Sequence, residues 1–150
     1  MTDTVSKETR SQMMASIRSC NTSPELIVRS ALHAFGFRFR VNARNLPGSP
    51  DIVLRKYNAA IFIHGCFWHG HHCSLYKVPS SRSEYWLEKV RKNKLRDRRT
   101  TKELHALGWR TRVVRECAIR KASRSRNFPS FINKLSAWIK SGLYLKSIKL

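Results

Sequence analysis

The sequence predicts one α/β domain in which helices flank a central β-sheet. Short apolar runs of strand length occur at 52–54, 60–63 and 109–114, and segments with helical spacing lie between and after them. The 150 residues, of which 41% are hydrophobic, can bury one core but hardly two. A cluster of cysteine and histidine residues follows one of these runs and indicates a structural metal site in the same domain.

The composition is strongly basic. Thirty Lys and Arg residues stand against nine Asp and Glu residues, which gives a formal net charge of +21. The plainest reason for such a balance is a polyanionic partner, and nucleic acid is the first candidate. The sequence has no apolar stretch of 18 residues and no apolar signal segment at its N-terminus, so we expect a cytoplasmic protein that does not enter a membrane. In a reducing compartment the four cysteines are better read as metal ligands or thiols than as disulfides.

Residues 1–20 form a polar, basic arm, for which we expect about one helical turn that lies on DNA. Residues 22–25 read TSPE and are typical of a helix start, with Thr as the cap, Pro in the first turn and Glu three residues after the Thr. Glu25 is therefore either a capping carboxylate or a functional group, and both readings stay open. The expected apolar face comprises Leu26, Ile27, Ala31, Leu32 and Phe35, and Gly36 ends the helix.

Asp51 stands at the start of what should be a central strand. Residues 37–41 alternate apolar and basic side chains as a half-buried strand does, and 42–50 form a loop rich in turn residues. The apolar run 52–54 then follows Asp51 directly, and a turn at 56–58 leads to the next strand. A carboxylate in this place requires a partner or a metal ion, although an Asp in a turn after proline is also common.

Residues 61–73, IFIHGCFWHGHHC, concentrate the chemistry of the chain. Cys66, His71 and Cys73 supply two thiolates and one imidazole, and Cys117, which follows the next predicted strand, is the natural fourth ligand of a tetrahedral zinc ion. His69 and His72 are alternative candidates for the histidine ligand of the zinc ion. The alternative is that the cysteines are small buried hydrophobic residues and the histidines are solvated. Cys20 is left over in either case.

A long basic helix is predicted from Ser81 to Gly108, with Ser83 as its cap. Between 89 and 102 it carries eight basic residues and one acidic residue, Asp97, so we expect it to face DNA phosphates. After the strand at 109–114, residues 121–126 are expected to be a flexible basic linker, and the residues from 128 onwards an amphipathic helix that packs on the core. The expected division is thus a basic arm (1–20), a core (21–120) and a linker with a C-terminal helix (121–150).

Seven fragments between about 9 and 117 together resemble one family, the very short patch repair (Vsr) DNA mismatch endonucleases. They are TRSQMM, LPGSPDIV, IFIHGCFWHGHHC, YKVP, EYWLEK, RDRR and GWRTRVV. The resemblance implies a restriction-endonuclease-like core with a central mixed β-sheet. It also implies a Mg²⁺-dependent nick 5′ of the thymine in a T:G mismatch, of the kind that deamination of 5-methylcytosine leaves in double-stranded DNA. We expect a monomer that works with mismatch-repair proteins.

The resemblance implies a role for each site residue. Asp51 is the Mg²⁺ ligand, and the Ile63 carbonyl and His64 take the place of the acid and lysine that are usual further along the chain. His69 is the general base, oriented by Asp97, and Glu25 reaches metal-bound water. The implied zinc ligands are Cys66, His71, Cys73 and Cys117, and the implied aromatic wedge in the base stack is Phe67, Trp68 and Trp86.

The chain departs from the family pattern at two positions, with Gly70 where a longer run of histidines is common and Ile63 where Thr is common. Two rival functions remain. One is a zinc-stabilised nucleic-acid-binding protein without catalysis, in which Asp51 and His69 would be incidental. The other is a restriction endonuclease that cuts both strands.

Overall fold

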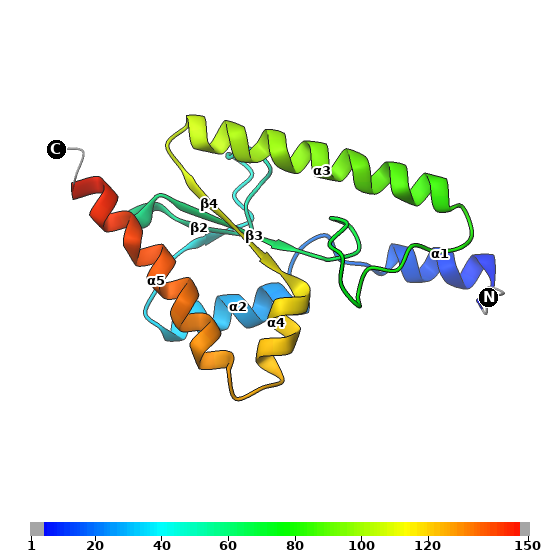
Figure 1. Cartoon of the computed structure of the whole chain (residues 1–150), viewed down its shortest axis with the longest axis horizontal. Coiled ribbons are helices and arrows are strands. Elements are labelled where there is room, and N and C mark those ends of the chain that lie inside the picture. Colours follow the sequence, from blue (N-terminus) through cyan, green and yellow to red (C-terminus); the bar gives the residue numbers. More distant parts are fainter. Residues whose placement is uncertain (1–4, 148–150) are drawn as a thin grey trace.

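The computed structural model describes residues 5–147, and it shows a four-stranded mixed sheet with helices on both faces (Figure 1). The helices are α1 (Lys7–Ala15), α2 (Ser23–Ala34), α3 (Ser83–Ala106), α4 (Glu116–Ser123) and α5 (Phe128–Ser147), and the strands are β1 (Arg40–Val41), β2 (Ile52–Leu54), β3 (Ala59–His64) and β4 (Arg110–Arg115). The order β1-β2-β3-β4 is antiparallel up to β3, and β3 pairs with β4 in parallel. This confirms the predicted α/β class and mixed sheet, whereas the restriction-endonuclease-like assignment stays a prediction.

The two faces of the sheet have different partners. Figure 1 shows α3 along one face and α2, α4 and α5 on the other. Because side chains alternate along a strand, β3 directs Ile61 and Ile63 towards the second group of helices and Phe62 and His64 towards α3. The main hydrophobic core lies on the side of α2, α4 and α5, and includes Val28, Leu32, Ile52, Leu54, Ile61, Val114, Ile119, Leu135 and Ile139. The face towards α3 is therefore the one left for polar side chains.

Helix α2 begins and ends where the sequence predicted, and its buried face was predicted in part: Leu32 is fully buried and Ile27 packs against the core. Thr22 is the N-cap, and Gly36 follows the helix with φ +87°. Leu26 and Phe35, which were expected to pack, are 49% and 45% exposed. The buried positions are Glu25, Val28, Arg29 and Leu32, which lie three and four residues apart on one helical face. A buried ion pair on this face was not visible in the apolar pattern.

Three further boundaries differ from the prediction. Helix α1 has nine residues and is capped by Ser6, whose Oγ accepts from the N–H of Thr9. Ser83 is inside α3, and the N-cap is Arg82 in the left-handed conformation, with φ +54°. The predicted linker from 121 is still helical at its start, because α4 extends to Ser123 and buries Ile119 and Ala122. Gly108, with φ +83°, follows α3 as predicted.

A close contact brings the loop at 42–50 against α3. A Cβ atom at Gly48 would lie 2.3 Å from the Thr100 side chain, and the φ of Gly48 is +70°. Only glycine fits both conditions. The contact holds the segment before Asp51 beside the middle of α3. Within residues 5–147, no helix is long and apolar enough to cross a membrane.

Candidate active site

A cleft of about 1080 Å³ lies where β2 begins and β3 ends, and we call it the main cleft. Its walls come from the segment between α1 and α2, the loop at 42–50, the residues after β3 and the middle of α3. The predicted site residues that line it are Glu25, Asp51, Ile63, His64, Trp68, His69 and Asp97. The structure thus brings together residues from four separate segments of the chain.

Asp51 lies directly before β2 and is fastened to β3. The N–H of Ile63 donates a hydrogen bond to Oδ2 of Asp51 at 2.6 Å. Burial raises the pKa of Asp51 to about 6 despite this hydrogen bond, and the nearby Glu25 carboxylate adds to the rise. A buried carboxylate whose charge is destabilised in this way is stabilised by a bound cation. The sequence prediction that Asp51 requires a partner is therefore supported by its surroundings.

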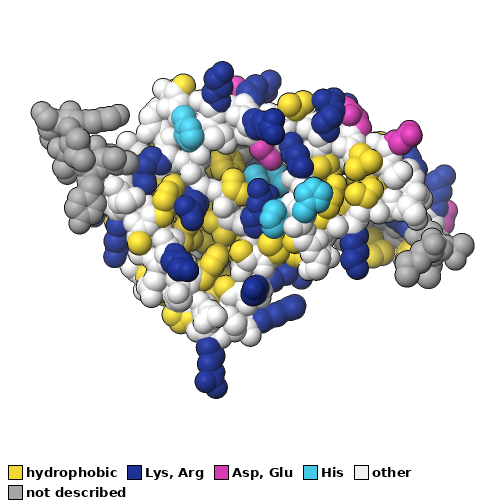
Figure 2. All heavy atoms as spheres, viewed as in Figure 1, with side chains coloured by type: hydrophobic (Ala, Val, Ile, Leu, Met, Phe, Trp, Pro, Cys, Tyr) yellow, Lys and Arg dark blue, Asp and Glu magenta, His cyan; other side chains and the backbone are white. Residues whose placement is uncertain are grey.

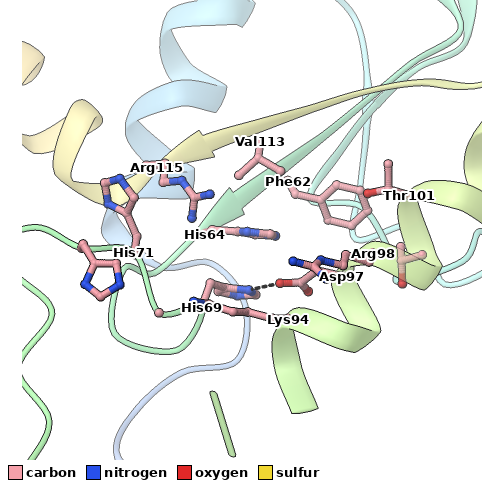
Figure 3. Close-up of a pocket in the computed structure, with 13 residues that line it drawn as sticks. Phe62, His64, His69, His71, Lys94, Asp97, Arg98, Thr101, Val113 and Arg115 are labelled. Atoms are coloured by element: carbon pink, nitrogen blue, oxygen red, sulfur yellow. Dashed lines mark hydrogen bonds and ion pairs between the residues drawn. The ribbon is translucent and has the colours of Figure 1, made fainter. Parts of the chain in front are cut away.

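His64 and His69 form a stacked pair above the end of the sheet (Figure 3). Their ring centroids are 3.6 Å apart and their planes differ by 8°. His64 is buried as the last residue of β3, and burial, followed by the charge of His69, lowers the pKa of His64 to about 3. His64 is therefore a neutral imidazole at physiological pH, which can donate or accept a hydrogen bond without adding charge.

Asp97 orients His69, as predicted. Nδ1 of His69 lies 2.6 Å from Oδ2 of Asp97, which comes from α3. Burial favours the neutral acid, but the hydrogen bond from His69 outweighs it and lowers the pKa of Asp97. An ionised Asp97 favours the tautomer of His69 that carries its proton on Nδ1, in which Nε2 has the lone pair. This is the arrangement that a general base requires.

Glu25 is held in place by local hydrogen bonds. It accepts from the backbone N–H of Asn21 and the hydroxyl of Thr22, both at 2.9 Å, and it forms a buried ion pair with Arg29 at 2.9 Å. These contacts lie around the start of α2, but Thr22 makes no side-chain capping hydrogen bond, so both interpretations of Glu25 stay open. Its carboxylate also lines the main cleft with Asp51, so its proposed contact with metal-bound water stays a prediction.

The three predicted wedge residues form one aromatic cluster. The ring centroids of Phe67 lie 5.0 Å from Trp68 and 5.5 Å from Trp86, and Trp68 lies 6.1 Å from Trp86, all edge to face. Of the three, only Trp68 lines the main cleft, and the other two pack behind it. The side-chain amide of Asn93 donates to the carbonyl of Trp68 at 2.8 Å, which fixes the loop to α3.

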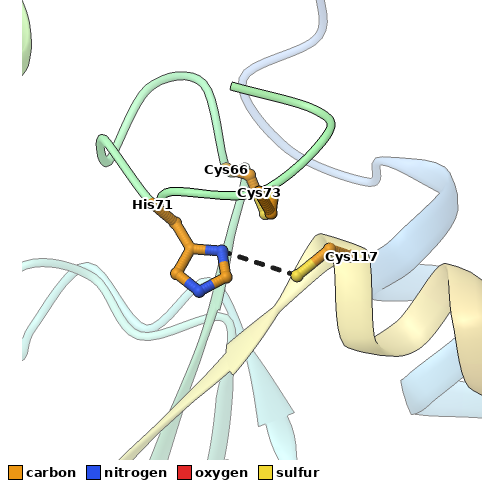
Figure 4. A group of neighbouring side chains, drawn as sticks. All are labelled: Cys66, His71, Cys73 and Cys117. Atoms are coloured by element: carbon orange, nitrogen blue, oxygen red, sulfur yellow. Dashed lines mark hydrogen bonds between the residues drawn. The ribbon is translucent and has the colours of Figure 1, made fainter. Parts of the chain in front are cut away.

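Cys66, His71, Cys73 and Cys117 form the predicted ligand cluster (Figure 4). Their sulfur and nitrogen atoms all lie within 4.8 Å of one another, and Sγ of Cys117 is 3.5 Å from Nδ1 of His71. Three of the residues lie in the loop after β3, and Cys117 lies in the first turn of α4. The four side chains can hold one metal ion that joins this loop to α4. His69 and His72 are outside the cluster, and Cys20 is exposed.

The sequence reasoning missed several residues that complete the site. Arg29 donates to Glu25, to the Asn42 side chain and to the backbone carbonyl of Asp51. Nζ of Lys89 lies 5.3 Å from the ring centroid of Trp68. The signal for Lys89 and Asn93 was their four-residue spacing from each other and from the predicted Asp97 along α3, which places them on one face. No comparable signal existed for Arg29.

The sequence was compared with known proteins. The family described as DNA mismatch endonuclease Vsr matches residues 2–75. The chain is 45% identical to DNA mismatch endonuclease Vsr of Escherichia coli (strain K12) over 139 residues, which are 93% of this chain and 88% of that protein. It is 48% identical to the type II nicking enzyme V.XorIIP of Xanthomonas oryzae pv. oryzae over 119 residues, or 79% of this chain and 88% of the relative.

A third relative is the type II nicking enzyme V.NmeAIP of Neisseria meningitidis serogroup A. It is 44% identical over 126 residues, which cover 84% of this chain and 90% of that enzyme. These three matches cover 79% to 93% of this chain and 88% to 90% of the relatives. The chain therefore belongs to the Vsr family of DNA mismatch endonucleases.

Proposed function

We propose that this chain is a Mg²⁺-dependent endonuclease that nicks one strand of duplex DNA on the 5′ side of the thymine in a T:G mismatch. The observation that carries the proposal is the convergence of Asp51, His64 and the His69–Asp97 pair in one cleft beside an aromatic cluster. The names of its relatives, mismatch endonuclease and nicking enzymes, support the same reaction class. We further propose that it acts as a monomer in the bacterial cytoplasm and passes the nick to mismatch-repair proteins.

Each chemical requirement of hydrolysis has a residue in the cleft. Asp51 has one carboxylate oxygen beyond the hydrogen bond from Ile63, and the Ile63 carbonyl leaves β3 on the same side as its N–H. These two oxygens would hold Mg²⁺, which supplies charge stabilisation for the phosphate when bound. Nε2 of His69 accepts a proton from the attacking water, and His64 donates a hydrogen bond to a phosphate oxygen. Glu25 would orient a water molecule beside Asp51.

The four-residue Cys/His cluster fits a structural zinc ion. A tetrahedral zinc with bonds of about 2.3 Å to sulfur and about 2.0 Å to nitrogen places those two atoms about 3.5 Å apart. This is the distance between Cys117 and His71. Four protein ligands leave no open position for chemistry, so the role is to fix the loop that presents His69 and Trp68.

Mismatch selection follows from the cost of opening a base step. Placing an aromatic side chain between bases costs a few kcal/mol per step, and the cost is lower at a mispair than at a Watson–Crick pair. The cluster of Phe67, Trp68 and Trp86 is half-buried and already assembled, so little ordering entropy is lost when it enters the DNA. The wedge therefore favours the duplex that opens more easily.

One experiment tests the proposal. The protein is incubated with T:G and matched duplexes of the same sequence, each strand labelled separately, with and without Mg²⁺. We expect a nick in the thymine strand of the mismatched duplex only, and only with Mg²⁺. Binding without a nick would favour the non-catalytic alternative, and cleavage of both strands would favour a restriction endonuclease.

The His69–Asp97 pair gives a prediction of its own. We expect Asp97→Asn to slow single-turnover nicking by about 100-fold or more, because the Asn amide carries no charge and can donate to Nδ1, which favours the unproductive tautomer of His69. Mismatch binding and the Mg²⁺ concentration for half-maximal rate should stay unchanged, since Asp51 is untouched. Glu103→Gln, on the outer face of α3, is the control. An unchanged rate in folded Asp97→Asn would exclude His69 as a base oriented by Asp97.

The aromatic cluster of Phe67, Trp68 and Trp86 gives a second prediction. Trp68→Ala is expected to lower the preference for T:G over matched duplex by about 5- to 150-fold, because base–aromatic stacking is worth about 1 to 3 kcal/mol per base. Phe67→Ala and Trp86→Ala should have smaller effects, since both lie behind Trp68. The measurement is binding to paired and mispaired duplexes, with thermal melts of each variant and Phe35→Ala as the control at an exposed aromatic residue outside the cluster. A folded Trp68→Ala protein with full preference would place the wedge elsewhere.

A further inference from the structure

A second hollow, of about 610 Å³, lies on the α3 face of the sheet, and we call it the basic hollow. Its floor is formed by Phe62 and His64 of β3 and by Val113 and Arg115 of β4, which are direct neighbours in the parallel register. Its walls are one side of α3 and residues 69–72 of the loop after β3, which we call the histidine loop. Figures 2 and 3 show basic and histidine side chains around this hollow, with His69 and Asp97 at its edge.

Three cations line the basic hollow, and none of them has an ion-pair partner among the described residues. They are Lys94 and Arg98 of α3 and Arg115 at the end of β4. The one carboxylate in the hollow, Asp97, is already hydrogen-bonded to His69. The hollow therefore carries a net positive charge that no side chain described here neutralises.

The basic residues on the outer face of α3 behave differently. Glu88 pairs with Arg91 at 2.8 Å and with Lys92 at 3.8 Å, and Glu103 pairs with Arg99 at 3.5 Å. The acidic residues of the helix thus satisfy cations that face away from the hollow. These pairs join residues three and four positions apart on the helix. The three cations of the hollow have no such acidic partner in the part of the chain that the structure describes and are available to an anion.

Gly70 determines where the ammonium group of Lys94 lies. A Cβ atom at Gly70 would be 2.7 Å from Cε and 3.0 Å from Nζ of Lys94, and 2.5 Å from a methyl group of Val90. Gly70 also has φ +60°, which favours glycine. The residue that departs from the family pattern is therefore the one that lets Lys94 lie across the histidine loop.

The basic hollow and the main cleft meet at the stacked histidines and Asp97. His64, His69 and Asp97 line both of them, whereas Asp51 and Trp68 line only the main cleft. Along α3, Trp86 of the wedge and the neighbouring Lys89 come first, and the cations of the hollow follow at 94 and 98. A DNA strand that passes the histidine pair from the aromatic cluster reaches the basic hollow next.

We propose that Lys94, Arg98 and Arg115 bind the backbone phosphates immediately 5′ of the nick. This inference rests on the proposed function, which places the mismatched thymine at the wedge on the 3′ side of the scissile phosphate. Arg98 and Arg115 contact the phosphates with charge-assisted hydrogen bonds, and Lys94 contributes a point charge from the loop side. The site holds the strand on the upstream side while the wedge holds it downstream, so the scissile phosphate is fixed between two anchors.

The test combines protein and DNA changes. Each of the three phosphates 5′ of the nick is replaced, one at a time, by an uncharged methylphosphonate in a T:G duplex. Binding in the absence of Mg²⁺, with the Cys/His cluster left loaded, is then measured for the wild type, Arg98→Ala and Arg99→Ala. We expect one or two replacements to weaken wild-type binding about tenfold or more and to have little further effect in Arg98→Ala. Arg99→Ala, whose arginine pairs with Glu103 on the outer face, should respond like the wild type.

Salt dependence provides a second measurement on the same proteins. Arg98→Ala should reduce the slope of log K against log salt by about 0.9 for a lost phosphate contact, and Arg99→Ala should leave it unchanged. Strictly additive effects of Arg98→Ala and every methylphosphonate would overturn the inference, and so would equal slopes for the two variants. Because the readout is binding, a protein that shows the coupling but makes no nick would disprove the proposed function and leave the phosphate site standing.

Discussion

Asp51→Asn is expected to reduce mismatch nicking by at least about a thousandfold. The loss of a metal ligand removes several kcal/mol of charge stabilisation from the reacting phosphate, and each 1.4 kcal/mol is a factor of ten in rate. Asn retains an oxygen that can accept the hydrogen bond from the Ile63 N–H, so the contact between β2 and β3 survives. Mismatch binding should stay within about tenfold of the wild type, because the wedge and the phosphate contacts are intact.

The same substitution has an opposite effect on stability. The pKa of Asp51 is about 6 in the folded protein and near 3.8 in the unfolded chain. The folded state therefore binds the proton more tightly. As pH rises from about 4 to 6, the free energy of unfolding of the Mg²⁺-free protein falls. Asp51→Asn removes the cost of burying a charged carboxylate. Above pH 6, and without Mg²⁺, the variant should therefore melt at a higher temperature than the wild type. Such a gain in stability at the expense of activity is typical of a functional site.

The pH dependence of nicking follows from the same group. Below pH 6 a proton competes with Mg²⁺ for Asp51, so the rate at limiting Mg²⁺ should fall as pH is lowered through about 6. Raising the Mg²⁺ concentration should move this fall to lower pH. Asp97→Asn, which keeps Asp51, should retain that shift. Mg²⁺-dependent nicking by Asp51→Asn at near wild-type rate would remove Asp51 from the metal site.

The fold was predictable where one sequence signal dominated. The apolar run of β3, the turn before it and the glycines after α2 and α3 each carry a strong local preference, and the structure agrees. The predicted buried face of α2 was right for Ile27 and Leu32. It missed Glu25 and Arg29, because two charges that satisfy each other leave no trace in an apolar pattern. Residues 121–123 were expected to be linker because their composition is polar and basic, yet Ile119 docks α4 on the core.

The chemically reactive residues of the candidate site could be predicted from the sequence, whereas the role of the basic residues around them could not. Asp51, the histidines and the cysteines have side chains whose chemistry is informative in itself, and the family resemblance assigned their roles. Lys94, Arg98 and Arg115 were seen only as general basic charge, because the division between paired and unpaired cations depends on which face of α3 meets the sheet. That division is a property of the packed helix and is absent from the composition.

Loss of one ligand from the Cys/His cluster is expected to have the largest effect on stability. We expect the purified protein to contain one equivalent of zinc, and Cys66→Ser and Cys117→Ser to lose it. Structural zinc contributes about 10 to 16 kcal/mol in zinc-finger peptides, which is comparable with the whole stability of a typical domain at about 5 to 15 kcal/mol. In this chain the ion would join the loop after β3 to α4, and Ile119 of α4 belongs to the hydrophobic core. Release of the ligands should therefore loosen the core as well as the loop.

The site chemistry is tied to the same ligands. His69 and Trp68 lie between Cys66 and His71, so the segment that carries the base and the wedge is fixed at both ends by the cluster. Cys66→Ser and Cys117→Ser should lower the melting temperature, the zinc content and mismatch nicking together, and a chelator should do the same to the wild type. Cys20→Ser, which changes an exposed cysteine outside the cluster, is the matched control and should change neither the melting temperature nor the zinc content. Metal analysis that finds no zinc in folded, fully active protein would show instead that the four side chains are held together by packing alone, and the loop would then have to be positioned by the Asn93 and Asp97 contacts from α3.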